Sequence, residues 1–166
     1  GVALGYHPSE SLHYVVGLDM YAPTGEYDRK DPSSLGKNYW TAQPVFALSR
    51  ISPDGFNADL KVMYDFNFTN SATDTRSGQA LHADYALGWG VGKGWVLGVG
   101  GYAFQQVTDD SGPNSAAGRA RGFGVGPSVR YMNEKGWLFT AKWQQDFKVK
   151  NRPEGAQLYV KLGIPF

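Results

Sequence analysis

The last nine residues of the chain, 158–166, constrain its fold more than any other segment. They alternate apolar and non-apolar side chains without a break and end on Phe166. Such period-two alternation predicts a β-strand with one apolar face. Strands of bacterial outer-membrane barrels alternate in this way, with their apolar side chains toward lipid. We therefore expect a final lipid-facing strand whose terminal Phe166 contacts the barrel assembly machinery.

The composition of the chain argues against several classes of protein. A chain of 166 residues with net charge +1 suits one domain and argues against a nucleic-acid partner. No apolar run approaches the ~18 residues that a membrane helix requires. The mean hydropathy of −0.39 is that of a soluble protein. In a membrane barrel, however, lipid-facing apolar residues alternate with polar lumen residues, and the average hides both. The chain has no cysteine, which excludes disulfides and thiol nucleophiles.

Alternation recurs along the whole chain, most clearly over residues 56–68, and predicts an antiparallel all-β fold. We expect nine strands, at residues 1–7, 12–22, 38–50, 56–68, 80–91, 94–107, 120–132, 137–149 and 157–166. We expect these strands to form a single up-and-down transmembrane barrel domain over residues 1–166. Bacterial single-chain barrels have even strand numbers, so an odd number of strands is expected to be missing upstream.

The connections between these strands alternate in length. Short turns are expected at 8–11, 51–55, 91–94 and 133–136, and long polar segments at 22–38, 69–79, 108–119 and 150–156. Membrane barrels have short periplasmic turns and long extracellular loops in this order. Three of the short turns place a glycine before an aromatic residue. We expect an aromatic girdle at the membrane interface, formed by Phe56, Trp89, Trp95, Tyr131 and Trp137.

The other face of the strands is polar and predicts a lumen. The residues expected to line the pore are His13, Asp19, Asp59, Lys61, Asp65, His82, Asp84, Arg130, Lys142, Gln144, Asp146 and Lys161. Most acidic members come from early strands, whereas Arg130, Lys142, Lys148 and Lys161 come from late ones. An acidic wall is therefore expected to face a basic wall. Glycines 88, 90, 98, 100, 122, 124 and 126 share this face, and they either leave open volume or pack against a bulky partner.

Motifs for catalysis or metal binding are weak. No serine accompanies His13 or His82 at a spacing that indicates an activated nucleophile. His82 and Asp84 lack a third ligand, and residues 109–114 lack the closing glutamate of a calcium loop. We therefore expect no enzyme activity, metal or cofactor. Rim cations either meet lipopolysaccharide phosphates or are solvated; they are Arg29, Lys30, Arg76, Arg119, Arg121, Lys150 and Arg152.

Several motifs together resemble an outer-membrane channel family named for the meta-pathway of phenol degradation. They are Ala22-Pro-Thr-Gly-Glu-Tyr-Asp28, Leu35-Gly-Lys-Asn-Tyr-Trp40, Ser52-Pro-Asp-Gly-Phe56, Arg76-Ser-Gly-Gln-Ala-Leu-His-Ala-Asp-Tyr85, Gly94-Trp95, Thr108-Asp-Asp-Ser-Gly112 and Asn151-Arg-Pro-Glu-Gly155. The resemblance covers nearly the whole chain but only the C-terminal part of the family's length. It implies a monomeric twelve-stranded barrel with an open pore, of which this chain lacks about three N-terminal strands.

The sequence thus predicts a bacterial outer-membrane channel for passive diffusion of small hydrophobic, aromatic or bulky organic molecules. Its expected partners are outer-membrane lipid, lipopolysaccharide and the solutes themselves. Two alternatives stay open: an outer-membrane lipid-modifying enzyme, and a soluble β-barrel that binds a small ligand.

Overall fold

The protein is an antiparallel sheet of nine strands. The computed structural model describes residues 1–31, 34, 36–113, 115 and 117–165. The large sheet has the order β1-β2-β3-β4-β7-β8-β9-β10-β11, so each strand pairs with its neighbours along the chain. Its strands are β1 (Val2–Tyr6), β2 (Leu12–Tyr21), β3 (Thr41–Arg50), β4 (Phe56–Asn67), β7 (Ala80–Gly90), β8 (Trp95–Gln106), β9 (Arg121–Met132), β10 (Leu138–Lys150) and β11 (Ala156–Gly163). This architecture confirms the predicted all-β meander.

The strand bounds agree closely with the alternation, and the differences have local causes. Strand β3 starts at Thr41 and not at residue 38, where Asn38 has a left-handed φ of 54°. Strand β11 stops at Gly163, ahead of Pro165, which has no backbone N–H for a ladder. Alternation did not predict the small hairpin of β5 (Thr69–Asn70) and β6 (Thr75–Arg76). Phe166, the expected contact of the assembly machinery, lies outside the described residues.

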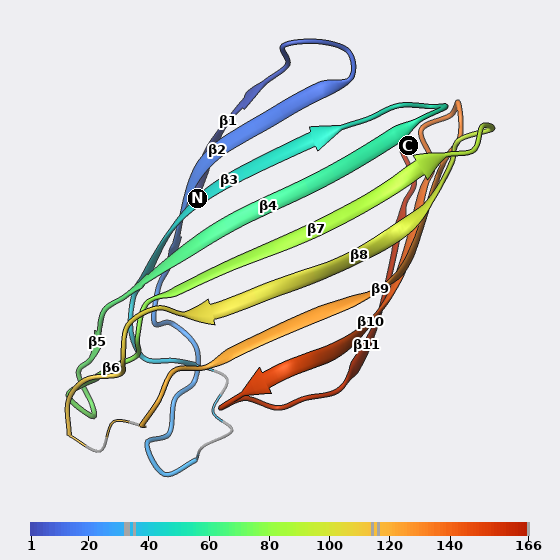
Figure 1. Cartoon of the computed structure of the whole chain (residues 1–166). Coiled ribbons are helices and arrows are strands. Elements are labelled where there is room, and N and C mark those ends of the chain that lie inside the picture. Colours follow the sequence, from blue (N-terminus) through green and yellow to red (C-terminus); the bar gives the residue numbers. More distant parts are fainter. Residues whose placement is uncertain (32–33, 35, 114, 116, 166) are drawn as a thin grey trace.

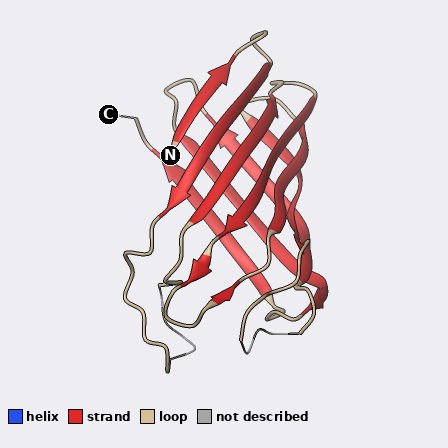
Figure 2. Cartoon of the chain, turned by 90° about the vertical axis from the view of Figure 1, so that its left-hand side faces the viewer, coloured by secondary structure: helices blue, strands red, loops and turns tan. Residues whose placement is uncertain are grey.

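The sheet is strongly curved, and its two edges stay apart in the described part of the chain (Figures 1 and 2). Side chains on its concave face reach across intervening strands. The Nη2 atom of Arg130 on β9 donates to Oδ1 of Asn57 on β4 over 2.9 Å, passing β7 and β8. Strands β1 and β11, the two edges, run in the same direction, because each leads from the long-connection end toward the short-turn end.

The connections separate by length, as the sequence predicts. The turns at 7–11, 51–55, 91–94 and 133–137 lie at one end of the sheet, and the long connections lie at the other (Figure 1). The turn at 91–94 shows why glycine is needed: Gly92, Lys93 and Gly94 all have positive φ, of 82°, 51° and 79°. Glycine adopts this region without steric cost. No helix in the described residues is long and apolar enough to cross a membrane.

The sheet has almost no conventional core. Among the described residues, the only buried hydrophobic side chains are Met63 and Ala80, both on the concave face. Large apolar side chains instead lie exposed on the convex face. One row of ladder partners there comprises Leu4, Val16, Phe46, Val62, Ala83, Ala103, Phe123 and Phe147. The hydrophobic surface of this fold therefore faces outward.

Candidate functional site

The concave face carries all twelve residues that the sequence predicts to line the pore. Residues directly opposite in an antiparallel ladder share a face, and these positions connect through such pairs. Asp59 is the partner of Ser49, which is the partner of His13. Lys61 is opposite Asp84, and Lys161 is opposite Thr140, itself opposite Arg130. The same pairing places the rest of the set on this face: Asp19, Asp65, His82, Lys142, Gln144 and Asp146.

The acidic and basic residues of this face are not fully separated. Arg130 lies 4.0 Å from a carboxylate oxygen of Asp59, in addition to its hydrogen bond with Asn57. The expectation of two opposed walls is therefore modified at this point. The curvature of the sheet brings β9 within reach of β4, so Arg130 connects the late strands to the early strands.

The glycines of the concave face do not simply leave open volume. A Cβ on Gly98 would lie 2.0 Å from the carbonyl oxygen of Leu87, and one on Gly126 would lie 1.9 Å from that of Trp143. A Cβ on Gly124 would meet the ring of Tyr102 at 2.4 Å. Close backbone approach and packing against a tyrosine thus explain these glycines, which permit the tight curvature of β7 to β10.

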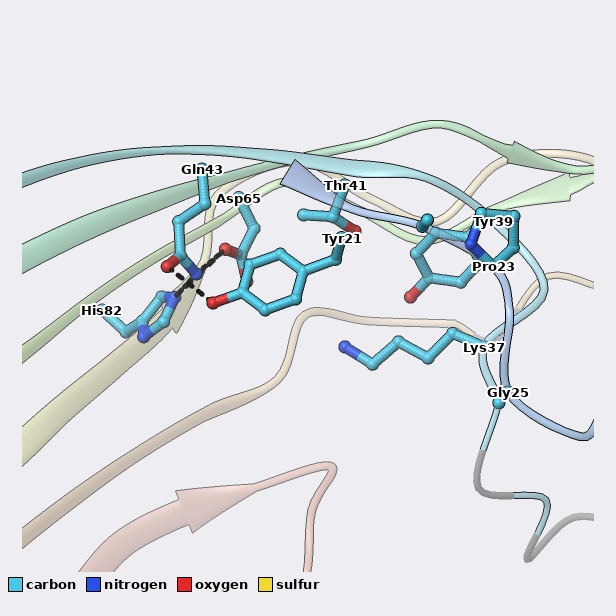
Figure 3. Close-up of a pocket in the computed structure, with 11 residues that line it drawn as sticks. Tyr21, Pro23, Gly25, Lys37, Tyr39, Thr41, Gln43, Asp65 and His82 are labelled. Carbon is cyan, nitrogen blue, oxygen red and sulfur yellow. Dashed lines mark hydrogen bonds and ion pairs between the residues drawn. The ribbon is translucent and has the colours of Figure 1, made fainter. Parts of the chain in front are cut away.

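A pocket opens at the long-connection end of the concave face (Figure 3). Its volume is about 410 Å³. Its lining comprises Tyr21, Ala22, Pro23, Gly25, Gly36, Lys37, Tyr39, Thr41, Gln43, Asp65 and His82. Two tyrosine rings and a proline provide apolar surface, while the ammonium of Lys37 projects into the same space. We call this the loop-end pocket.

The floor of the loop-end pocket is a fixed hydrogen-bonded chain. The hydroxyl of Tyr21 donates to Oε1 of Gln43 over 3.3 Å, and Nε2 of Gln43 donates to Oδ1 of Asp65 over 2.6 Å. The same Asp65 oxygen lies 3.2 Å from Nε2 of His82. The pocket therefore combines aromatic walls, hydrogen-bonding groups below and the ammonium of Lys37. Asp65 and His82 were predicted to line the pore, whereas Tyr21, Gln43 and Tyr39 were not.

A second polar cluster lies further along the same face. The hydroxyl of Tyr102 donates to Oδ1 of Asp146 over 2.6 Å, and the guanidinium of Arg152 lies over the rings of Tyr102 and Phe104. Gln144 is 1 % exposed, and its Nε2 has no hydrogen-bond partner among the described residues. The two aromatic residues of β8 that follow Gly100, Tyr102 and Phe104, both point inward, opposite Asp84 and His82.

The strand β10 departs from simple alternation near its end. The ladder with β9 shifts register between Phe147 and Lys150, and Lys148 has a left-handed φ of 53°. Val149 turns to the concave face, where its Cγ2 lies 3.6 Å from the Cβ position of Gly122. The alternation that predicted an inward Lys148 is thus broken by a β-bulge, which the sequence pattern did not indicate.

The residues predicted to form an aromatic girdle gather at the short-turn end. Phe56 is the ladder partner of Trp89, and the rings of Trp95 and Tyr131 lie 4.7 Å apart. Trp137 directly precedes β10 and is 47 % exposed. All five side chains therefore lie around one rim of the sheet.

The described residues show neither a catalytic triad nor a metal cluster. Ser49 lies between His13 and Asp59 in the ladder, but both ring nitrogens of His13 are engaged elsewhere, by His7 and by the carbonyl of Glu10. A serine activated by histidine requires a hydrogen bond between the two side chains. No group of three or more His, Cys, Asp or Glu able to hold a metal ion occurs in the described part of the chain.

A family model described as "Putative MetA-pathway of phenol degradation" matches residues 1–162. No curated protein and no solved structure matches the chain. Because the family model spans nearly all of the sequence, the chain belongs to this phenol-degradation family.

Proposed function

We propose that the chain forms the wall of a bacterial outer-membrane channel through which small aromatic and other organic solutes diffuse passively. The observation that carries the proposal is the division of the sheet into two faces. The convex face is apolar and exposed, whereas the concave face holds the charged and hydrogen-bonding residues. A sheet with this polarity suits a lipid exterior and an aqueous interior.

The exposure of the convex face is too large for a monomer in water. On strands paired at both sides, Leu87, Leu97 and Trp143 are still 44 %, 51 % and 44 % exposed. Burying one such side chain is worth about 1.5–3 kcal/mol, and soluble monomers rarely expose contiguous apolar patches above a few hundred Å². Lipid would cover the whole face at once. This argument favours a membrane protein over the soluble ligand-binding barrel.

Aromatic side chains at both rims support the same environment. The girdle at the short-turn end has a counterpart at the other end, where Trp40, Phe66, Phe68 and Phe147 are exposed. Tryptophan and tyrosine concentrate at membrane interfaces because their rings are amphipathic. The short turns would then face the periplasm and the long connections the cell exterior.

The direction of the edge strands limits how the proposed barrel would close. Because β1 and β11 run in the same direction, antiparallel closure needs an odd number of additional strands between them. Three strands would complete the monomeric twelve-stranded barrel that the family resemblance implies. The polar concave face would then surround the pore.

The solute path would pass the loop-end pocket. Its tyrosines offer aromatic contact, its hydrogen-bonded floor offers polar contact, and the family match connects the chain with the degradation of phenol. Passive diffusion needs neither a cofactor nor a nucleophile, and we assign none.

The proposal is tested by reconstituting the protein into liposomes and measuring swelling in isosmotic solutes. We expect faster swelling than in protein-free liposomes, and a higher rate for a hydroxybenzoate than for a disaccharide. In planar bilayers, neutralising Asp59, Asp65 and Asp84 together should lower cation preference. Absence of conductance, or extraction of the native protein from membranes by alkaline carbonate, would contradict the proposal.

A further inference from the structure

Two cations lie side by side on the convex face, at the long-connection rim. Arg121 is the first residue of β9, and Lys150 is the last residue of β10. They are directly opposite each other in the ladder, and both are exposed. Neither takes part in an ion pair among the described residues. Like charges directly opposite in a ladder destabilise it, so this pair favours a bound anion.

The β-bulge of β10 creates this pair. In an uninterrupted strand, Lys150 would share the concave face with Asp146, because the two positions are an even number of residues apart. The register shift after Phe147 instead places Lys150 opposite Arg121, which shares the convex face with Leu81 and Gln105. The bulge requires a left-handed Lys148, a conformation that costs a non-glycine residue free energy. A β-bulge commonly redirects a side chain, and here it turns Lys150 outward.

Apolar rings lie directly below the two cations. Phe123 and Phe147 form the next pair in the β9–β10 ladder toward the membrane, and their ring centroids are 5.8 Å apart. Phe147 is 39 % exposed. The ladder partner of Phe123 on β8 is Ala103, whose small side chain leaves one side of the ring free of a bulky neighbour. Cations above exposed aromatic rings match the order of groups in a phosphorylated lipid, with the phosphate above the acyl chains.

We propose that Arg121 and Lys150 bind the phosphate of an acylated lipid in the outer leaflet, and that its acyl chains pack on Phe123 and Phe147. The site rests on the proposed membrane location of the chain. The guanidinium of Arg121 can form two parallel hydrogen bonds with phosphate oxygens, and the ammonium of Lys150 adds a point charge. One phosphate between them offsets the repulsion of the unoccupied pair.

Binding is measured by native mass spectrometry of the full chain in detergent, with lipid A, dephosphorylated lipid A and inorganic phosphate as separate probes. Wild-type protein should retain lipid A on the order of tenfold or more over the dephosphorylated form. The double variant R121Q/K150Q should lose this preference. The matched control R29Q/K30Q removes the same two residue types from an exposed loop at the same end, and should keep it.

A charge reversal separates binding from folding. K150E places an anion opposite Arg121, so the lipid-free variant should be at least as resistant to heat as wild type. Lipid A should no longer protect it. Equal lipid A retention by R121Q/K150Q and wild type would overturn the proposal, as would equal retention of both lipid forms. Displacement of lipid A by equimolar inorganic phosphate would also overturn it, because the site would then recognise phosphate alone.

Liposome swelling distinguishes this proposal from the channel function. R121Q/K150Q should swell at the wild-type rate, because both residues are on the convex face. Swelling without phosphate-dependent lipid binding would remove the lipid site and leave the channel. Lipid binding without swelling would leave the lipid site and remove the channel function.

Discussion

The early strands β2 to β4 and the late strands β8 to β10 line the same concave face in different ways. In the early strands alternation is unbroken, and side chains such as Gln43 and Asp65 project to form a hydrogen-bonded floor. In the late strands glycines bring backbones together, and a bulge interrupts the pattern. The contrast shows that alternation assigns a residue to one face of the sheet. Curvature decides whether that face has room for side chains or requires glycines, where neighbouring backbones approach closely.

Adding one carbon to the late strands should have the largest effect. In G98A or G126A, the new Cβ would overlap a carbonyl of the neighbouring strand, at 2.0 Å or 1.9 Å. Overpacking of this kind costs about 3 kcal/mol. G155A is the matched control, because no atom lies within 4 Å of its Cβ position. Denaturant unfolding in detergent measures the difference, and equal stability of G98A and G155A would refute the role of close backbone approach.

Removing the bridge between the two groups of strands should have a smaller effect. R130Q loses the contact with Asp59 and leaves Asn57 without its charged donor. A hydrogen bond to a charged group contributes about 1.5–3 kcal/mol, and the 4.0 Å separation from Asp59 adds little. We expect a loss of about 1.5 kcal/mol in the same unfolding assay. K161Q, an exposed cation on the same face, should be neutral; a comparable loss there would show that the bridge has no special role.

Changes in the early strands should affect solute passage more than stability. Y21F removes the donor to Gln43, and K37Q removes the cation of the loop-end pocket. Each change would remove one polar group that a solute in the pocket could contact, and the loss of a solute hydrogen bond worth about 1 kcal/mol corresponds to roughly fivefold weaker binding. Half-saturating concentrations for hydroxybenzoate uptake into liposomes should rise by that factor. Tyr6 lies on the convex face near the short turns, far from the pocket, so Y6F should leave uptake unchanged. An equal effect of Y6F would argue against the pocket.

The smallest effect is expected in the loop that follows β8. The guanidinium of Arg119 donates to both carboxylate oxygens of Asp109 and lowers the pKa of Asp109 below its ordinary value of 3.8. Because the folded-state pKa is the lower one, the stability from this contact is fully present above the ordinary pKa of 3.8. It is lost as the pH falls through the folded-state pKa. In R119Q the pKa of Asp109 should return to its ordinary range. Carboxyl NMR titration measures this, and an unchanged pKa would exclude Arg119 as the cause.

Strand positions and faces were predictable because both depend on local geometry. Period-two alternation identified all nine strands of the large sheet, and the glycine-aromatic turns located Phe56, Trp95 and Trp137 at one rim. The loop-end pocket was not predictable in the same way. Gln43 and Tyr21 lie on the polar face by alternation, but the chain of contacts from Tyr21 through Gln43 to Asp65 and His82 depends on the register of three strand pairings.

The sequence alone determined that one face is apolar and one polar, and that long and short connections alternate, because each property follows from neighbours in the chain. Only the tertiary structure decided that Arg130 reaches Asn57 and that Lys150 turns outward beside Arg121. The physical reason is that curvature and register belong to the sheet as a whole. A single left-handed residue, Lys148, is enough to reverse the face of the side chains that follow it.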